Sequence, residues 1–172
     1  MTAPAFTLER WRAGDGEAFY LASRDEALYR CMNDGFPKTP EACQALVRDF
    51  AQGGETSRCV RRVTVEGRVA GCAAAFFEGD VSCKNAEIAY WITAGLRGRG
   101  IMTQALREFS ALLFCQFGLH RLYARPFADN HASRRLLEKA GFACEGILRE
   151  SVYRDGRYND AALYALLAPG GD

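Results

Sequence analysis

The sequence predicts an α/β fold with a mixed, mostly antiparallel central sheet of about seven strands and helices on both faces. Runs in which apolar residues alternate with polar ones are interspersed with runs whose apolar residues recur every three or four positions. Their order is β-α-α-β-β-β-α-β-α-β-β, which favours parallel pairing only where a helix crosses over the sheet. The chain has 172 residues and contains no repeat or linker, so one domain over residues 1–172 is expected.

The N-terminal half contains residues that typically begin or end helices and hairpins. Asn33-Asp34-Gly35 ends one helical segment, and Thr39-Pro40-Glu41 is typical of a helix start, with a capping hydroxyl and a proline at the first helical position. Glu66-Gly67 indicates a tight hairpin turn. The predicted elements are a strand at residues 6–11, helical turns at 15–32, a helix from 39 to 53 and a hairpin at 58–77.

The C-terminal half has similar markers. Gly118 and Gly141 are expected to end two helices, Asn130 can cap the start of the second, and Asp155-Gly156 is a strong hairpin signal. The predicted elements are a nearly apolar strand at residues 86–93, a long helix at 102–117, a strand at 121–126, a helix at 130–140 and strands at 144–154 and 157–167.

Composition and charge exclude several classes of protein. The formal net charge of +1 argues against a DNA partner held by bulk electrostatics. No apolar run reaches the length of a membrane span, and the N-terminus lacks the layout of a secretion signal, so no membrane contact and a cytoplasmic location are expected. The seven cysteines include no Cys-x-x-Cys pair, which argues against a metal site. Most of these cysteines are expected to be small buried residues.

A glycine-rich stretch between the predicted strand at 86–93 and the long helix is the best candidate for a binding site. It comprises Arg97, Gly98, Arg99, Gly100, Ile101, Met102 and Thr103. Backbone N–H groups at a helix start attract anions, the glycines allow close approach, and the arginines add donors at the rim. The stretch lacks the Gly-Lys-Ser/Thr of a P-loop, and Thr103 stands where a Rossmann fingerprint needs glycine or alanine. A plain surface turn remains the alternative reading.

The segment 86–142 resembles the GNAT superfamily of acetyl-CoA-dependent N-acetyltransferases. Arg97-Gly98-Arg99-Gly100-Ile101-Met102 matches the family's pyrophosphate motif, Gln/Arg-x-x-Gly-x-Gly/Ala, except that Met102 replaces the final small residue. The RimJ/RimL-like branch is indicated by further matches in the family's order: Thr103-Gln104-Ala105, Leu119-His120-Arg121-Leu122, Asn130-x-x-Ser133, Leu137-Glu138-Lys139-Ala140-Gly141-Phe142 and Glu145-Gly146.

The resemblance implies how acetyl-CoA is held. Its pyrophosphate would lie on the amides of the glycine stretch, and Asn130 would reach the pantetheine chain, although a simple helix cap also explains this residue. In this fold the strand before the glycine turn splays from its neighbour, and free amides near Trp91, Ile92 and Thr93 would hold the pantetheine and the acetyl carbonyl. For the Trp91 side chain, plain core packing is an equal alternative.

The resemblance also implies catalytic roles. Glu87 matches the glutamate that some members use as a base through water, and its mostly apolar strand would raise its pKa by desolvation. An ordinary outward-facing strand glutamate is the alternative for this residue. Glu150 is a rival base. Many members place an acidic tyrosine seven residues after the asparagine, where this chain has Leu137, so Ser133 becomes the nearest hydroxyl for the leaving thiolate. The residues considered for the acceptor side are Tyr153, Tyr158 and Asp160.

The predicted function is therefore acetyl transfer from acetyl-CoA to a primary amine by direct attack in a ternary complex. The acceptor is either a protein N-terminus or a small molecule, and the sequence does not choose between them. The alternative is a GNAT-like module that binds acyl-CoA as a sensor without turnover. The oligomeric state stays open, with a homodimer as one option.

Overall fold

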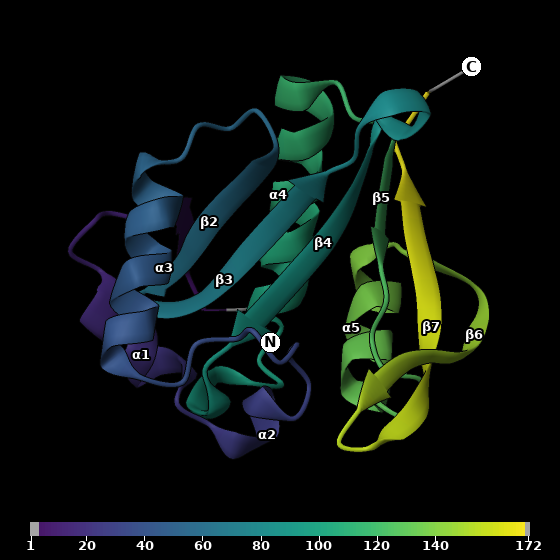
Figure 1. Ribbon diagram of the computed structural model, residues 1–172. Coiled ribbons are helices and arrows are strands. Elements are labelled where there is room, and N and C mark those ends of the chain that lie inside the picture. The colour runs from purple at the N-terminus through teal and green to yellow at the C-terminus, as the bar shows by residue number, and fades with distance from the viewer. Residues whose placement is uncertain (1–3, 171–172) are drawn as a thin grey trace.

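In the computed structural model, residues 4–170 form a seven-stranded sheet flanked by helices (Figure 1). The strands are β1 Phe6–Glu9, β2 Arg58–Val65, β3 Arg68–Phe77, β4 Asn85–Ile92, β5 Arg121–Ala124, β6 Ala143–Arg154 and β7 Arg157–Leu167. The helices are α1 Gly16–Ser23, α2 Glu26–Tyr29, α3 Pro40–Gln52, α4 Ile101–Phe117 and α5 His131–Ala140. Two short 3-10 turns, η1 Asp80–Ser82 and η2 Ala94–Leu96, were not predicted.

The sheet has the mixed character expected from the order of its elements. Its strand order is β1-β2-β3-β4-β5-β7-β6, and every neighbouring pair is antiparallel except β4 and β5. The parallel pair is joined by α4, so the prediction of parallel pairing at a helical crossover is confirmed.

Helices cover both faces of the sheet, as predicted. One core lies under α4 and α5 and includes Phe109, Leu113 and Leu137, while the second lies under α1 and α3 and includes Phe19 and Val47. Because side chains alternate along a strand, β4 contributes to both cores. Its even-numbered residues face α4 and α5, and Trp91 faces α1 and α3.

Local signals explain where most elements begin and end. The Thr39 hydroxyl accepts a hydrogen bond from the Ala42 N–H at 3.2 Å, so α3 starts as predicted. Helix α4 ends at Gly118 and α5 at Gly141, both in a left-handed backbone conformation. The β6–β7 hairpin turns at Asp155 and Gly156, whose φ angles are 51° and 77°, as type I′ geometry requires.

Most of the cysteines lie outside the two cores. Only three of the seven cysteines are buried, namely Cys43, Cys59 and Cys72, so the prediction that most are buried was wrong. The other four lie on exposed parts of helices, strands and loops, where a small side chain needs no core contact. Within residues 4–170, no helix combines the length and apolarity of a bilayer span, and no group of three metal-ligating side chains occurs.

Candidate functional site

The glycine stretch forms an anion-binding geometry at the start of α4. Gly98 and Gly100 have φ angles of 74° and 79°, a region that disfavours side chains. The first i-to-i−4 hydrogen bond of this helix runs from the Gln104 N–H to the Gly100 carbonyl at 3.0 Å. The amides of Ile101, Met102 and Thr103 therefore precede the intrahelical ladder and lie at the positive end of a 17-residue helix.

The side chains of the stretch explain how Met102 fits a position where the family motif has glycine or alanine. Ile101 and Met102 are buried in the core, so these residues offer ligands only their backbone amides. Gly71 on β3 provides the room, because a Cβ built there would lie 3.2 Å from Met102 Cε and 2.4 Å from the Trp91 carbonyl. The Met102 side chain therefore packs into the core below the glycine stretch, and it does not block the backbone amides of that stretch.

The two arginines of the stretch differ in their surroundings. Arg99 is exposed at the rim, as predicted. Arg97 forms an ion pair with Asp25, the N-cap residue of α2. The hydrogen bonds that Asp25 accepts from Ala27 and Arg97 outweigh its partial desolvation and lower the pKa of its carboxyl. The glycine stretch is thus tied to the segment around α2.

Next to the stretch, β4 and β5 separate and leave part of the β4 edge unpaired. Their register includes only Asn85, Ala86 and Glu87 of β4, whereas β4 stays paired with β3 as far as Ile92. Figure 1 shows the two strands diverging from this short contact. The backbone groups of β4 beyond Glu87 that point away from β3 therefore face a gap in the sheet.

Of Trp91, Ile92 and Thr93, the residues expected to lie near free amides, one directs its own N–H toward the gap. The Thr93 N–H donates to the Ala70 carbonyl at 2.7 Å. Because hydrogen-bonding direction alternates along an antiparallel pair, the Trp91 N–H also points to β3, and that of Ile92 points toward the gap. The Trp91 side chain is buried against Phe19 and Phe36, so the core-packing alternative is correct for it.

Across the gap, the start of α5 presents Asn130 and Ser133. The Asn130 side-chain oxygen accepts from the Ser133 N–H at 3.1 Å, which confirms its role as a helix cap. The Ser133 hydroxyl lies 2.7 Å from the hydroxyl of Tyr90 on β4. Burial raises the pKa of Tyr90. Leu137, where many family members have tyrosine, is fully buried, so no polar group at that position faces the gap.

Glu87 lies where β4 and β5 begin to separate, on the face opposite to Tyr90. Its two carboxylate oxygens accept from Nε and a terminal nitrogen of Arg125, both at 2.9 Å. These hydrogen bonds raise the pKa of Arg125. The expectation of an apolar, desolvating environment for Glu87 is wrong, because the side chain is one-third exposed and ion-paired. The positive charge that pairs with Glu87 comes from Arg125, which follows β5, so the sequence of β4 gives no sign of it.

Glu150, the rival base, is placed differently. It lies on β6 at an irregularity in the pairing with β7, with a left-handed φ of 52°, and its side chain is exposed. Its N–H donates to the Asp160 carboxylate at 2.8 Å. Strands β5 and β7 lie between β6 and β4 in the sheet, so the structure brings Glu87 rather than Glu150 to the edge of the gap.

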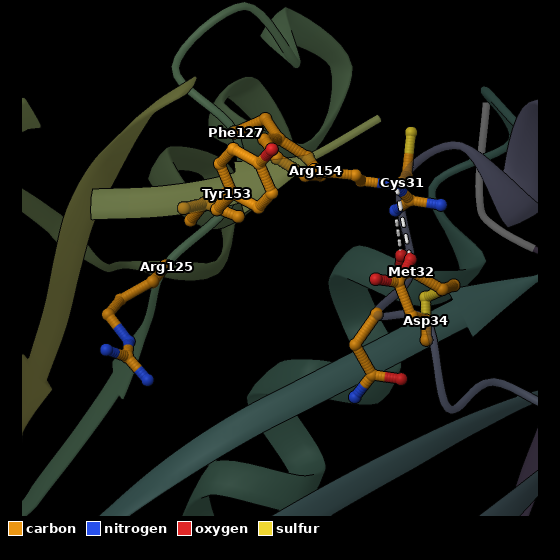
Figure 2. Close-up of a pocket in the computed structure, with 9 residues that line it drawn as sticks. Cys31, Met32, Asp34, Arg125, Phe127, Tyr153 and Arg154 are labelled. Atoms are coloured by element: carbon orange, nitrogen blue, oxygen red, sulfur yellow. Dashed lines mark hydrogen bonds and ion pairs between the residues drawn. The ribbon is translucent and has the colours of Figure 1, made fainter. Parts of the chain in front are cut away.

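A pocket of about 240 Å³ opens beside the Glu87–Arg125 pair, between the loop after α2 and the β6–β7 hairpin. Figure 2 shows Arg154 reaching from β6 toward the loop, where its guanidinium donates to the carbonyls of Tyr29 and Met32. Of the residues considered for the acceptor side, Tyr153 lines this pocket and contacts Tyr158 edge to face, with ring centroids 5.0 Å apart. The lining residues are Cys31, Met32, Asn33, Asp34, Arg125, Phe127, Val152, Tyr153 and Arg154.

Sequence reasoning missed Tyr90, Arg125 and Arg154. Tyr90 could have been assigned to the α5 face from alternation along β4, but its partner could not. Arg125 lies two residues after Tyr123, and the parallel register places Tyr123 beside Glu87. That register is what brings the Arg125 guanidinium to the Glu87 carboxylate. Arg154 bonds to a residue 122 positions earlier, a contact that no local pattern reveals.

Comparison with known proteins agrees with this geometry. The acetyltransferase (GNAT) domain family model matches residues 5–143. The probable N-acetyltransferase YjcK of Bacillus subtilis is 40% identical over 86 residues, which are 50% of this chain and 48% of that protein. The ribosomal-protein-serine acetyltransferase of Escherichia coli is 36% identical over 85 residues, 48% of this chain and 46% of that protein. The chain thus spans about half the length of the curated relatives it matches.

Among solved structures, the microcin C7 self-immunity acetyltransferase MccE in complex with acetyl-CoA and AMP superposes with a TM-score of 0.83. The alignment covers 95% of this chain and 92% of that one at 20% identity, which shows a shared fold. The family match covers most of the chain and includes the glycine stretch, the β4–β5 gap and the start of α5. The chain belongs to the GNAT acetyltransferase family.

Proposed function

We propose that this protein is an acetyl-CoA-dependent N-acetyltransferase that acts on a primary amine. The observation that carries the proposal is the junction of three features: the left-handed glycines before α4, the unpaired edge of β4, and the Asn130–Ser133 helix start across the gap. Together they would provide a phosphate site and, beside it, unpaired backbone groups for the pantetheine arm. Relatives named as N-acetyltransferases support the same reading.

The residues present fit acetyl-CoA as the donor substrate. A pyrophosphate carries negative charge and several acceptor oxygens, and the amides from Gly98 to Thr103 supply donors at a positive helix end. At Gly98 nothing lies within 4 Å of the position a Cβ would take, so this part of the loop is open to a ligand. The N–H groups of Tyr90 and Ile92 point toward the gap and are proposed to bind the pantetheine arm and the acetyl oxygen, whose developing negative charge such an amide would stabilise.

The acceptor amine is proposed to enter through the pocket beside Arg125. Glu87 would accept a proton from the amine through a bridging water. Each carboxylate oxygen has two lone pairs, and Arg125 uses one on each oxygen, which leaves capacity for a water. Arg125 fixes the orientation of the carboxylate through two hydrogen bonds. Arg154 holds the loop after α2 against β6 and so maintains the pocket wall.

In the proposed reaction the amine nitrogen attacks the acetyl carbon directly. A C–N bond forms, the C–S bond breaks, and its electron pair leaves with sulfur. The amine gives up one proton and sulfur gains one, so the products are an N-acetyl amine and coenzyme A thiol. Ser133 is the hydroxyl proposed to hydrogen-bond the departing sulfur, since Leu137 cannot. A free thiol has a pKa of about 8.5, so this assistance need only be modest.

The test is release of coenzyme A thiol from acetyl-CoA, measured with a panel of amines. Peptides with N-terminal serine or alanine come first, because relatives are named for acetylation of ribosomal proteins at those residues. Spermidine and other small amines form the second group. Amine-dependent release, with the acetylated product identified by mass spectrometry, is the expected result. Tight binding of acetyl-CoA without release for any amine would favour the sensor module instead.

A further inference from the structure

The side chain of Tyr90 contacts Ser133, the residue proposed to assist the departing sulfur. It extends from β4 across the gap to the first turn of α5, where its hydroxyl lies 2.7 Å from Ser133 Oγ. The same hydroxyl lies 3.4 Å from the Ser133 carbonyl, which can only accept. Tyr90 is the residue through which the β4 edge contacts the proposed thiol-side hydroxyl.

We infer that Tyr90 positions Ser133 by donating its hydroxyl hydrogen to Ser133 Oγ, so that the hydrogen of Ser133 is directed to the departing sulfur. This inference rests on the proposed acetyltransferase function. Tyr90 is a positioning residue, because it acts on the reacting atoms only through Ser133. A free serine hydroxyl can point its hydrogen in several directions. When Tyr90 donates to the Ser133 oxygen, the Ser133 hydrogen can no longer point to Tyr90.

The surroundings of both residues favour this direction of donation. The Ser133 carbonyl is a second acceptor on the same side, which draws the Tyr90 hydrogen toward α5. The backbone of Ser133 is fixed by the hydrogen bond from its N–H to Asn130, so its hydroxyl torsion is the main freedom left. Burial raises the pKa of Tyr90, which keeps the phenol protonated and disfavours a phenolate.

The step needs no net change in either hydroxyl. While the C–N bond forms and the C–S bond breaks, Ser133 stabilises the charge that develops on sulfur by a hydrogen bond. The proton that sulfur finally holds balances the one lost by the amine. Tyr90 therefore remains a phenol throughout, and removal of its hydroxyl should affect the step in which sulfur gains charge rather than binding of the donor.

The experiment compares four proteins with acetyl-CoA and the best amine: wild type, Tyr90→Phe, Ser133→Ala and the double variant. We expect Tyr90→Phe to lower kcat about 5- to 10-fold, the scale of one misdirected hydrogen bond, with unchanged coenzyme A affinity and acceptor KM. In the Ser133→Ala background, the same substitution should have no further effect on kcat, because the oxygen that Tyr90 orients is gone.

Tyr164→Phe is the matched control. Its hydroxyl is also covered by α5, where it donates to Glu138 at 2.7 Å and accepts from Arg134 at 3.2 Å. This variant removes a buried tyrosine hydroxyl from the same core without touching Ser133. It should lose stability to a similar degree as Tyr90→Phe but keep the wild-type kcat, which separates positioning from a general weakening of the packing around α5.

Two results would overturn the inference while leaving the proposed function standing. One is a Tyr90→Phe enzyme with wild-type or higher kcat, which would mean that the Ser133 hydrogen normally points to Tyr90. The other is an equal loss of kcat from Tyr90→Phe in both backgrounds, which would mean that Tyr90 acts independently of Ser133. If wild-type protein transfers acetyl to no amine, the proposed function fails, and the role of Tyr90 falls with it.

Discussion

Substituting alanine for Gly98 tests whether the glycine stretch binds the pyrophosphate of acetyl-CoA. The test requires the backbone strain of the substitution to be separated from its effect on acetyl-CoA affinity. Gly98 has a φ of 74°, where an L-residue costs about 1–2 kcal/mol. No atom lies within 4 Å of the added Cβ, so no steric clash adds to this backbone strain. The expected loss of stability is therefore about 1–2 kcal/mol, or about 2–8 °C in Tm for a chain of this size.

The loss of acetyl-CoA affinity should be larger than this strain alone explains. If the loop cradles a pyrophosphate, the new methyl group or a rotated peptide removes one hydrogen bond to a charged group, worth about 1.5–3 kcal/mol. That corresponds to a dissociation constant raised about 10- to 100-fold. Calorimetric titration of the folded variant with acetyl-CoA measures this change directly.

Gly118→Ala is the matched control at the other end of the same helix. Gly118 has a φ of 59°, and the nearest atom to an added Cβ is the mobile Lys84 amine at 3.5 Å, so its strain of about 1–2 kcal/mol is similar. The 17 residues of α4 separate it from the phosphate loop, about 25 Å at the usual helical rise. Equal affinity losses in the two variants, or an unchanged affinity in Gly98→Ala, would refute the proposed phosphate site.

Three further predictions follow from particular contacts. Glu87→Gln should retain acetyl-CoA affinity but lower turnover about 100-fold; if Glu150→Gln is instead the slow variant in the thiol-release assay, the wrong carboxylate was chosen. Gly71→Ala should reduce the free energy of unfolding in urea by about 3 kcal/mol, and Met102→Ala should not rescue it, because the Trp91 carbonyl is the nearer obstacle at 2.4 Å. Burial raises the pKa of Cys43 and Cys59 to about 11 and that of Cys72 to about 12, and it also raises the pKa of Cys31. At pH 8 a disulfide reagent should therefore modify native protein quickly at Cys83, Cys115 and Cys144, more slowly at Cys31, and at all seven thiols only after unfolding.

The predictions from sequence succeeded where a short stretch of chain determines its own conformation. Thr39-Pro40 starts a helix and Asp155-Gly156 turns a hairpin because capping and positive φ are properties of those residues themselves. The glycine stretch belongs to the same class, since its geometry depends on glycine at two positions and on the helix that follows. These features were enough to predict the left-handed glycines and the helix start on which the proposed donor site rests.

The chemistry beside that site depends on contacts between distant segments. The sequence around Glu87 is apolar and suggested a desolvated base, but the parallel register brings Arg125 to it and makes an ion pair. The direction of hydrogen bonds along β4 likewise depends on its pairing with β3, which occupies the Thr93 amide. Such facts follow from strand pairing rather than from residue type, so periodicity alone could not supply them.

The alternation of β4 gives the proposed reaction its geometry. Odd-numbered Glu87 and even-numbered Tyr90 project from opposite faces of the strand. The backbone edge between those faces, with the Ile92 amide, points into the gap where β4 and β5 separate. Direct transfer requires the amine to reach a face of the acetyl carbonyl while the thioester is held in a fixed orientation. In the proposed mechanism, this single strand carries the amine-side carboxylate on one face, amides for the donor along its edge and the support for the thiol-side hydroxyl on the other face. Because the proposed amine attacks the thioester directly, this mechanism needs no covalent acyl-enzyme.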